Sequence, residues 1–123
     1  MSQIKSFIDL SAWKEAHKLV LAIYEATRRF PSEEKFGLVN QLRRAVVSIS
    51  SNIAEGFSRN TNKEKVQFYY TALGSLTEVH NQSIIAKDVA YIDTRQFGKL
   101  MQQIITVNKL LNGLIKSAKN MSR

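Results

Sequence analysis

Apolar residues recur every three or four positions along most of the chain, and no window alternates apolar and polar residues as a half-buried strand does. Four stretches carry this period, and they predict helices at about residues 10–29, 33–57, 62–91 and 94–119. The last stretch is the most regular, because its apolar positions keep the three-four spacing of left-handed bundles. These positions are Phe97, Leu100, Ile104, Val107, Leu111, Leu114 and Ala118.

Capping residues set the limits of the first two helices. Asp9 is expected to accept hydrogen bonds from the first backbone amides of the first helix, and Pro31 closes that segment. Glu33 and Glu34 suit the first turn of the second helix, where the helix dipole favours anions. Gly56 is expected to terminate that helix.

Two capping boxes start the remaining helices, at Thr61 with Glu64 and at Asp93 with Gln96. The connections between the helices are short, which makes consecutive helices antiparallel neighbours. The predicted fold is therefore an all-α, up-down-up-down, left-handed antiparallel four-helix bundle. It forms a single domain over residues 1–123.

The same spacing assigns an inward stripe to each of the first three helices. The inward positions are Trp13, Ala16, Val20, Ile23 and Thr27 in the first helix, Leu38, Leu42, Ala45, Ile49 and Ile53 in the second, and Val66, Tyr69, Leu73, Leu76, His80 and Ile84 in the third.

The first two helices carry more apolar surface than one bundle needs. Leu21 and Tyr24 lie at one edge of a wide apolar arc in the first helix, and Phe36 and Val47 lie outside the stripe of the second. Because monomers rarely expose such patches, this surplus predicts a homo-oligomer that associates through these two helices. The alternative is a monomer with broadly amphipathic helices.

Composition excludes several classes of protein. The chain has no cysteine, so it has neither a disulfide framework nor a cysteine-ligated metal. Its five glycines lie far apart, which excludes the glycine-rich loops that bind nucleotide phosphates. The longest apolar run, Leu19 to Tyr24, cannot span a bilayer, and Met1 to Leu10 lacks the pattern of a signal peptide. We expect a cytoplasmic protein with no membrane partner.

Charge is concentrated at the C-terminal end. The net charge is +8, and residues 95–123 contain six basic residues and no acidic residue. This asymmetry favours an acidic partner, most often nucleic acid, although a solvated basic face is the plainer alternative. The candidate nucleic-acid-binding residues are Arg95, Lys99, Lys109, Lys116, Lys119 and Arg123.

A narrow polar strip follows one side of the second predicted helix. Its residues are three or four positions apart and comprise Gln41, Arg44, Ser48, Asn52, Glu55 and Arg59. Such a strip suits a ligand groove or a contact to phosphate, or else a hydrogen-bonded network between helices or subunits. Glu55 and Arg59 have the spacing of an ion pair within one helix.

No catalytic, cofactor or metal site is predicted. No serine has a base near it in sequence, as a nucleophile requires. His17, His80 and Glu78 lack the spacing of a metal-binding motif, and a satisfied structural histidine is the more common case. No small-molecule substrate can be identified.

The segment Gln41 to Arg59, QLRRAVVSISSNIAEGFSR, resembles the signature of small proteins encoded in intervening sequences of bacterial 23S ribosomal RNA genes. AWKEAHKLVLAIYEATRRFP and ALGSLTEV match the flanking motifs of that family. The resemblance implies a four-helix bundle, a homopentamer and no known catalytic activity. The family is similar in shape to the basic pentameric accessory proteins of diversity-generating retroelements, which bind nucleic acid and a reverse transcriptase.

The resemblance carries over to ten positions, none of which has an agreed role. These positions are Arg43, Arg44, Ser48, Asn52, Glu55, Gly56, Arg59, Gly74, Ser75 and Glu78. The fourth helix varies within the family, so its basic residues are evidence from this sequence alone.

The favoured hypothesis is a non-enzymatic oligomer that binds nucleic acid, structured RNA in particular, through the fourth helix. Such binding would be directed mainly to phosphate and would depend strongly on salt. The alternative is a protein-interaction scaffold whose basic face docks an acidic partner or a polymerase.

Overall fold

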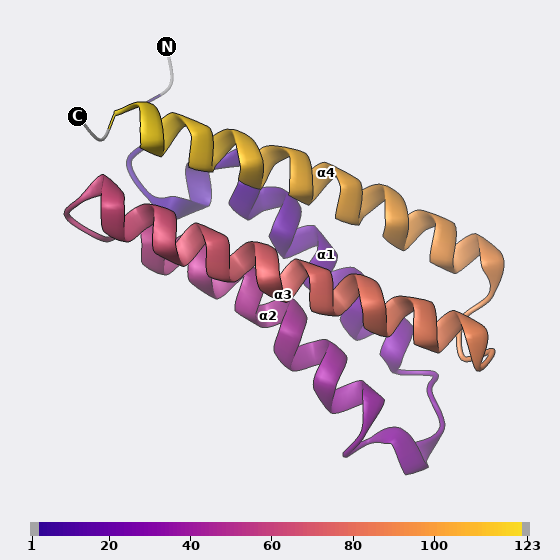
Figure 1. Cartoon of the computed structure of the whole chain (residues 1–123). Coiled ribbons are helices and arrows are strands. Elements are labelled where there is room, and N and C mark those ends of the chain that lie inside the picture. The colour runs from indigo at the N-terminus through magenta and orange to yellow at the C-terminus, as the bar shows by residue number, and fades with distance from the viewer. Residues whose placement is uncertain (1–2, 122–123) are drawn as a thin grey trace.

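The computed structural model describes residues 3–121 and contains four long helices, with no β-strand in that range. The helices are α1 (Ser11–Thr27), α2 (Leu38–Phe57), α3 (Asn62–Asp88) and α4 (Thr94–Asn120), with short 3-10 helices η1 (Phe7–Asp9) and η2 (Ser32–Glu34). Successive helices run in opposite directions, so both ends of the chain lie at the same end of the molecule (Figure 1). The predicted four-helix bundle is confirmed.

Each helix packs against its neighbours in sequence, and α1 packs against α4 to close the ring. The apolar stripes meet in one continuous core. The largest fully buried apolar side chains come from all four helices and are Leu19, Ile23, Leu42, Val46, Ile49, Ile53, Val79, Val107 and Leu111. Leu19 and Val46, which the sequence placed outside the inner stripes, belong to this core.

The start of α1 differs from the prediction that Asp9 caps it. Asp9 instead closes a capping box around η1, where its carboxylate accepts from the backbone N–H groups of Lys5 (3.0 Å) and Ser6 (3.1 Å). These two hydrogen bonds lower the pKa of Asp9. α1 begins at Ser11 after Leu10, which supplies no side-chain cap.

The predicted start of α2 near residue 33 is also wrong, because the helix begins at Leu38. Glu34 still serves its N-terminus, since its carboxylate accepts from the Leu38 N–H (3.1 Å). The other oxygen of Glu34 accepts from the Tyr91 hydroxyl at 2.7 Å. The Tyr91 hydrogen bond, followed by that of Leu38, lowers the pKa of Glu34. Glu34 therefore caps the start of α2 from the preceding turn.

The inward stripe of α3 departs from the prediction beyond Leu76. His80 and Ile84, assigned to the core, are exposed, and Val79 and Ser83 are buried in their place. The stripe keeps its alternating steps of three and four residues, which brings polar side chains inward and leaves isoleucines outside. A prediction based on apolar residues alone therefore assigns the isoleucines to the core.

The end of α3 is a Schellman motif, three residues before the predicted limit near residue 91. Tyr91 N–H donates to the Ala86 carbonyl (2.8 Å) and Ala90 N–H donates to the Lys87 carbonyl (3.0 Å). Ala90 has a φ of 66°, in the left-handed region that ends a helix. The capping residues Thr61 and Asp93 lie where the sequence placed them, at the starts of α3 and α4.

Gly56 does not terminate α2, and no glycine in residues 3–121 has a positive φ. It lies inside the helix and is buried against α3, where an added Cβ would come within 2.7 Å of Tyr69 Cε1 and 3.0 Å of Phe68 Cβ. Tyr69 is buried at this contact, and burial raises the pKa of its hydroxyl. Gly56 thus allows the close approach of α2 to α3.

We expect Gly56→Ala to destabilise the protein by about 1–3 kcal/mol, because the new methyl group overlaps the Tyr69 ring. Gly74→Ala on α3 is the matched control. A Cβ at Gly74 meets nothing within 4 Å, so the higher helix propensity of alanine should stabilise the fold by about 1 kcal/mol. Denaturant unfolding measures both, and equal effects of the two substitutions would contradict the close-contact role.

Tyr91→Phe should reduce stability at neutral pH and have a smaller effect in acid. The pKa of Glu34 is lowered in the fold from its ordinary 4.5, so its contribution is present above that value and is lost as the pH falls through the folded pKa. Tyr91→Phe removes the largest cause of the shift. The stability gap between the two proteins should therefore narrow below pH 4.5 in denaturant titrations, whereas Tyr70→Phe should show no such acid dependence.

Candidate nucleic-acid interface

The cations of α4 lie on the side of the helix that faces away from the core. Arg95, Lys99, Lys109, Lys116 and Lys119 are all exposed, and we call these five residues the basic ribbon. Arg123, the sixth predicted residue, lies outside the described residues. The buried positions of α4 occupy the opposite face, so the core holds the ribbon outward.

Within residues 3–121, no acidic side chain forms an ion pair with the basic ribbon. The ion pairs found within residues 3–121 are Lys18–Glu15, Arg28–Glu25 and Arg59–Glu55, all on α1, α2 or the turns beside them. Lysines close to a helix C-terminus interact favourably with its dipole, but Arg95 lies in the first turn of α4, where a cation is disfavoured. Arg95 therefore has neither a favourable dipole interaction nor an ion pair within residues 3–121.

The two ends of the basic ribbon reach the neighbouring helices. Lys119 Nζ donates to the Tyr70 hydroxyl on α3 (2.6 Å) and lies 5.0 Å from the centre of its ring. Lys99 lines a groove of about 230 Å³ between α1 and α4, together with Glu25 and Arg29. The ribbon thus crosses the outer face of α4 from the α1 side to the α3 side.

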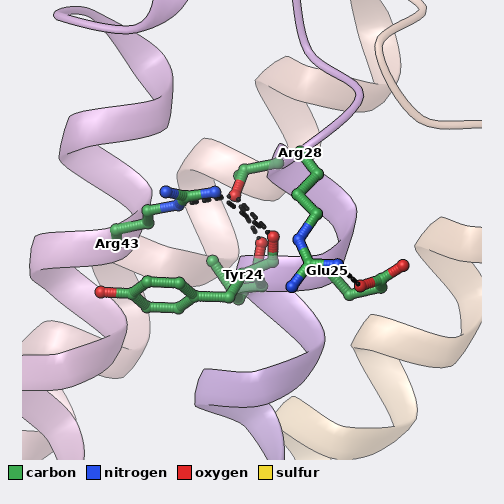
Figure 2. Close-up of polar contacts among 6 residues, drawn as sticks. Tyr24, Glu25, Arg28 and Arg43 are labelled. Atoms are coloured by element: carbon green, nitrogen blue, oxygen red, sulfur yellow. Dashed lines mark hydrogen bonds and ion pairs between the residues drawn. The ribbon is translucent and has the colours of Figure 1, made fainter.

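The end of α1 adds positive charge beside Lys99. Glu25 pairs with Arg28, whose Nη1 lies 3.1 Å from the carboxylate (Figure 2). Arg29 has no ion pair within residues 3–121 and lines the same groove as Lys99. Sequence reasoning missed this contribution, because α1 and α4 are about seventy residues apart along the chain and no local pattern joins them.

Arg43 joins α2 to the C-terminal end of α1. Its Nε donates to Thr27 Oγ1 (2.9 Å), its Nη2 donates to the Tyr24 carbonyl (3.4 Å), and its guanidinium lies 4.6 Å from the centre of the Tyr24 ring (Figure 2). A cation at this position also interacts favourably with the carbonyl end of the helix dipole. Arg43, one of the matched signature positions, therefore has a structural role.

The middle of the polar strip on α2 forms a hydrogen-bonded network with α3. Asn52 Nδ2 donates to the Ser48 carbonyl (2.8 Å) and to Ser48 Oγ (3.0 Å), and Ser75 Oγ donates to Ser48 Oγ (2.9 Å). The Glu55–Arg59 ion pair follows at 2.8 Å. These contacts account for Ser48, Asn52, Glu55 and Arg59 within one chain.

The other end of the polar strip lines a groove. Gln41 and Arg44 from α2 face Glu78 and Gln82 from α3 across a space of about 410 Å³. The spacing along α2 predicts that Gln41 and Arg44 share one side of the helix, but it does not indicate that Glu78 and Gln82 of α3 line the same groove. From the sequence, Glu78 was considered only as a possible metal ligand and as a position matched by the family resemblance. Gln82 was not singled out, because polar residues are rarely assigned to a core face.

The histidines and carboxylates do not assemble a metal site. His17 stacks on Trp13 with ring centres 4.8 Å apart, and His80 lies exposed on α3. No group of three histidine, aspartate or glutamate residues within 3–121 is placed to hold a metal ion. In the same range, no helix is both long and apolar enough to cross a bilayer.

Residues 8–113 match the family model of the 23S rRNA-intervening sequence proteins. The chain belongs to this family. A similar solved structure is a protein of unknown function from the S23 ribosomal protein family of Bacteroides thetaiotaomicron VPI-5482. It has a TM-score of 0.78 at 20% sequence identity, over 85% of this chain and 95% of that chain, a likeness that shows the fold. No curated protein matches this member of the family in sequence.

Proposed function

We propose that this protein is a non-enzymatic oligomer that binds nucleic acid, with structured RNA as the favoured partner, through the basic ribbon of α4. The observation that carries the proposal is the lack of any ion pair for the ribbon within residues 3–121. Unpaired surface cations are suited to phosphate groups, whose binding releases counterions. An RNA partner would place the protein in the cytoplasm.

Oligomerisation would multiply this surface. Apolar side chains on α1, on α2 and in the turn before α2 are exposed, including Leu21 (57%), Phe36 (87%) and Val47 (37%). Contact between copies would remove them from water. A homopentamer, which the family resemblance implies, would carry five times the +8 charge of one chain and present five basic ribbons to one polymer.

A second candidate function is the docking of an acidic protein, such as a polymerase subunit. It is favoured by Ile105, which is 59% exposed on α4 between ribbon residues. An exposed apolar side chain adds nothing to a phosphate contact but suits an acidic amphipathic helix.

The double substitution Lys109→Glu with Lys116→Glu should abolish RNA binding and leave the oligomer intact. Both side chains are exposed, and neither forms an ion pair within residues 3–121. Each reversal of charge would place an anion opposite phosphate. Fluorescence anisotropy with a structured RNA, at several salt concentrations, measures the change. Affinity of the unaltered protein should fall steeply with salt.

The matched control is Lys14→Glu with Lys35→Glu, which changes the net charge equally at exposed positions away from α4. This variant should keep most of the affinity. Equal losses in both variants would show that net charge alone drives binding, and undiminished binding by the α4 variant would exclude the basic ribbon as the site. Binding of an acidic protein that survives nuclease treatment would favour the second candidate.

Leu21→Glu with Val47→Glu should convert the oligomer to monomers, because two charges per chain would have to be buried at the contact between copies. Both positions are exposed in one chain, so the helical content should be unchanged by circular dichroism. Ile105→Glu, on α4, is the control and should leave the oligomer intact. Light scattering gives the mass of each variant, and an oligomer that persists in the double variant would place the interface elsewhere.

A further inference from the structure

The polar groove between α2 and α3 combines opposite charges that do not neutralise each other. Arg44 lines it from α2 and Glu78 from α3, and neither has an ion pair within residues 3–121. At about 410 Å³ the groove falls within the usual range of about 300–1,000 Å³ for small-ligand sites. It lies across the bundle from α4, because α2 and α4 are not in contact.

A buried amide with an unsatisfied oxygen also lines this groove. Gln82 is only 8% exposed, and its Oε1 has no hydrogen-bond partner. A buried carbonyl oxygen without a donor is destabilising, so natural proteins usually pair such an atom. Because the terminal torsion of glutamine is broad and two-fold, the amide can turn its oxygen toward a donor in the groove.

The wall opposite Gln82 is held in place. Ser48, which lines the groove, is bonded to Asn52 on its own helix and to Ser75 on α3. These bonds fix the position of α2 against α3, so the groove exists before a ligand arrives. Preorganisation of this kind lowers the entropy cost of binding.

We propose that this groove binds a guanine base. Guanine has two adjacent donors, N1–H and the exocyclic amine, which a carboxylate such as Glu78 can accept together. Its O6 and N7 atoms form a pair of acceptors that an arginine such as Arg44 binds in bidentate fashion. The Gln82 oxygen would accept from the remaining amine hydrogen.

The other bases fit this set of side chains less well. Adenine presents an acceptor, N1, where guanine presents a donor, so the Glu78 carboxylate would repel it. Cytosine has an acceptor pair, O2 and N3, but its exocyclic amine is its only donor group, so it cannot offer two adjacent donors to Glu78. Uracil has a single donor between two carbonyl groups. The inference goes beyond the proposed function, because this groove is distinct from the basic ribbon of α4. The guanine would be either a free nucleotide or an unpaired base of an RNA strand.

Calorimetric titration of the full-length protein with GMP, IMP and AMP tests the assignment. GMP should bind most tightly, IMP more weakly because it lacks the exocyclic amine, and AMP most weakly. Glu78→Gln should weaken GMP binding by roughly ten- to a hundredfold and remove the advantage over IMP. Glu33→Gln, an equal charge change at an exposed position outside the groove, should leave all three affinities unchanged.

One further measurement distinguishes a free guanine nucleotide from a guanine within RNA. A second distinguishes failure of the guanine site from failure of RNA binding at α4. Oligouridine containing one guanine, compared with the same strand containing one adenine, tests a base within RNA. The variant Lys109→Glu with Lys116→Glu should still bind GMP, so loss of RNA binding at α4 and loss of the guanine site are distinguishable. Equal or absent binding of GMP and AMP at millimolar concentration, or a GMP preference that survives Glu78→Gln, would overturn the guanine assignment.

Discussion

The close contact between α2 and α3 is the constraint on which the rest of the structure depends. At Gly56 no side chain intervenes between the α2 backbone and the Tyr69 ring, and an added Cβ would come within 2.7 Å of Tyr69 Cε1. The helices lie close together at the end joined by residues 58–61 and separate toward the start of α2 (Figure 1). Ser48 and Ser75 bridge them midway, and the groove with Arg44 and Glu78 lies beyond this bridge. A helix pair packed tightly along its whole length would leave no such groove.

Several charged side chains are used to complete helix ends, which distinguishes them from the charges of α4. Arg43 donates to the last turn of α1, Lys65 donates to the Phe57 carbonyl at the end of α2 (2.6 Å), and Glu34 accepts from the first amide of α2. Orphan backbone groups at helix termini need such partners. Lys109 and Lys116 are exposed and form no ion pair within residues 3–121, so their charge would be available to a partner.

The two proposed binding surfaces lie on different sides of the bundle and have different chemistry. The basic ribbon of α4 offers exposed cations that have no ion pair within residues 3–121 and would bind phosphate without reading sequence. The groove between α2 and α3 offers a carboxylate, a guanidinium and an amide, which can discriminate between bases. The apolar side chains that would join copies of the chain, such as Leu21 and Val47, lie on α1 and α2. Under these proposals α4 would supply phosphate affinity, while base selectivity and self-association would come from neighbouring positions of α2, since Val47 lines a groove together with Arg44 and Ser48.

The sequence by itself determined the four helices, their order and most of the core, because a helical period depends only on local spacing. The capping residues Thr61 and Asp93 were equally local and were placed correctly. Only the tertiary structure decided the inward register of α3 beyond Leu76, since the burial of Ser83 and Gln82 depends on the helices packed against them. The role of Gly56, the partners of Arg43 and the meeting of Arg44 with Glu78 also depend on helix packing. Residues distant in the chain meet only when the bundle closes, and no repeat along one helix encodes that contact.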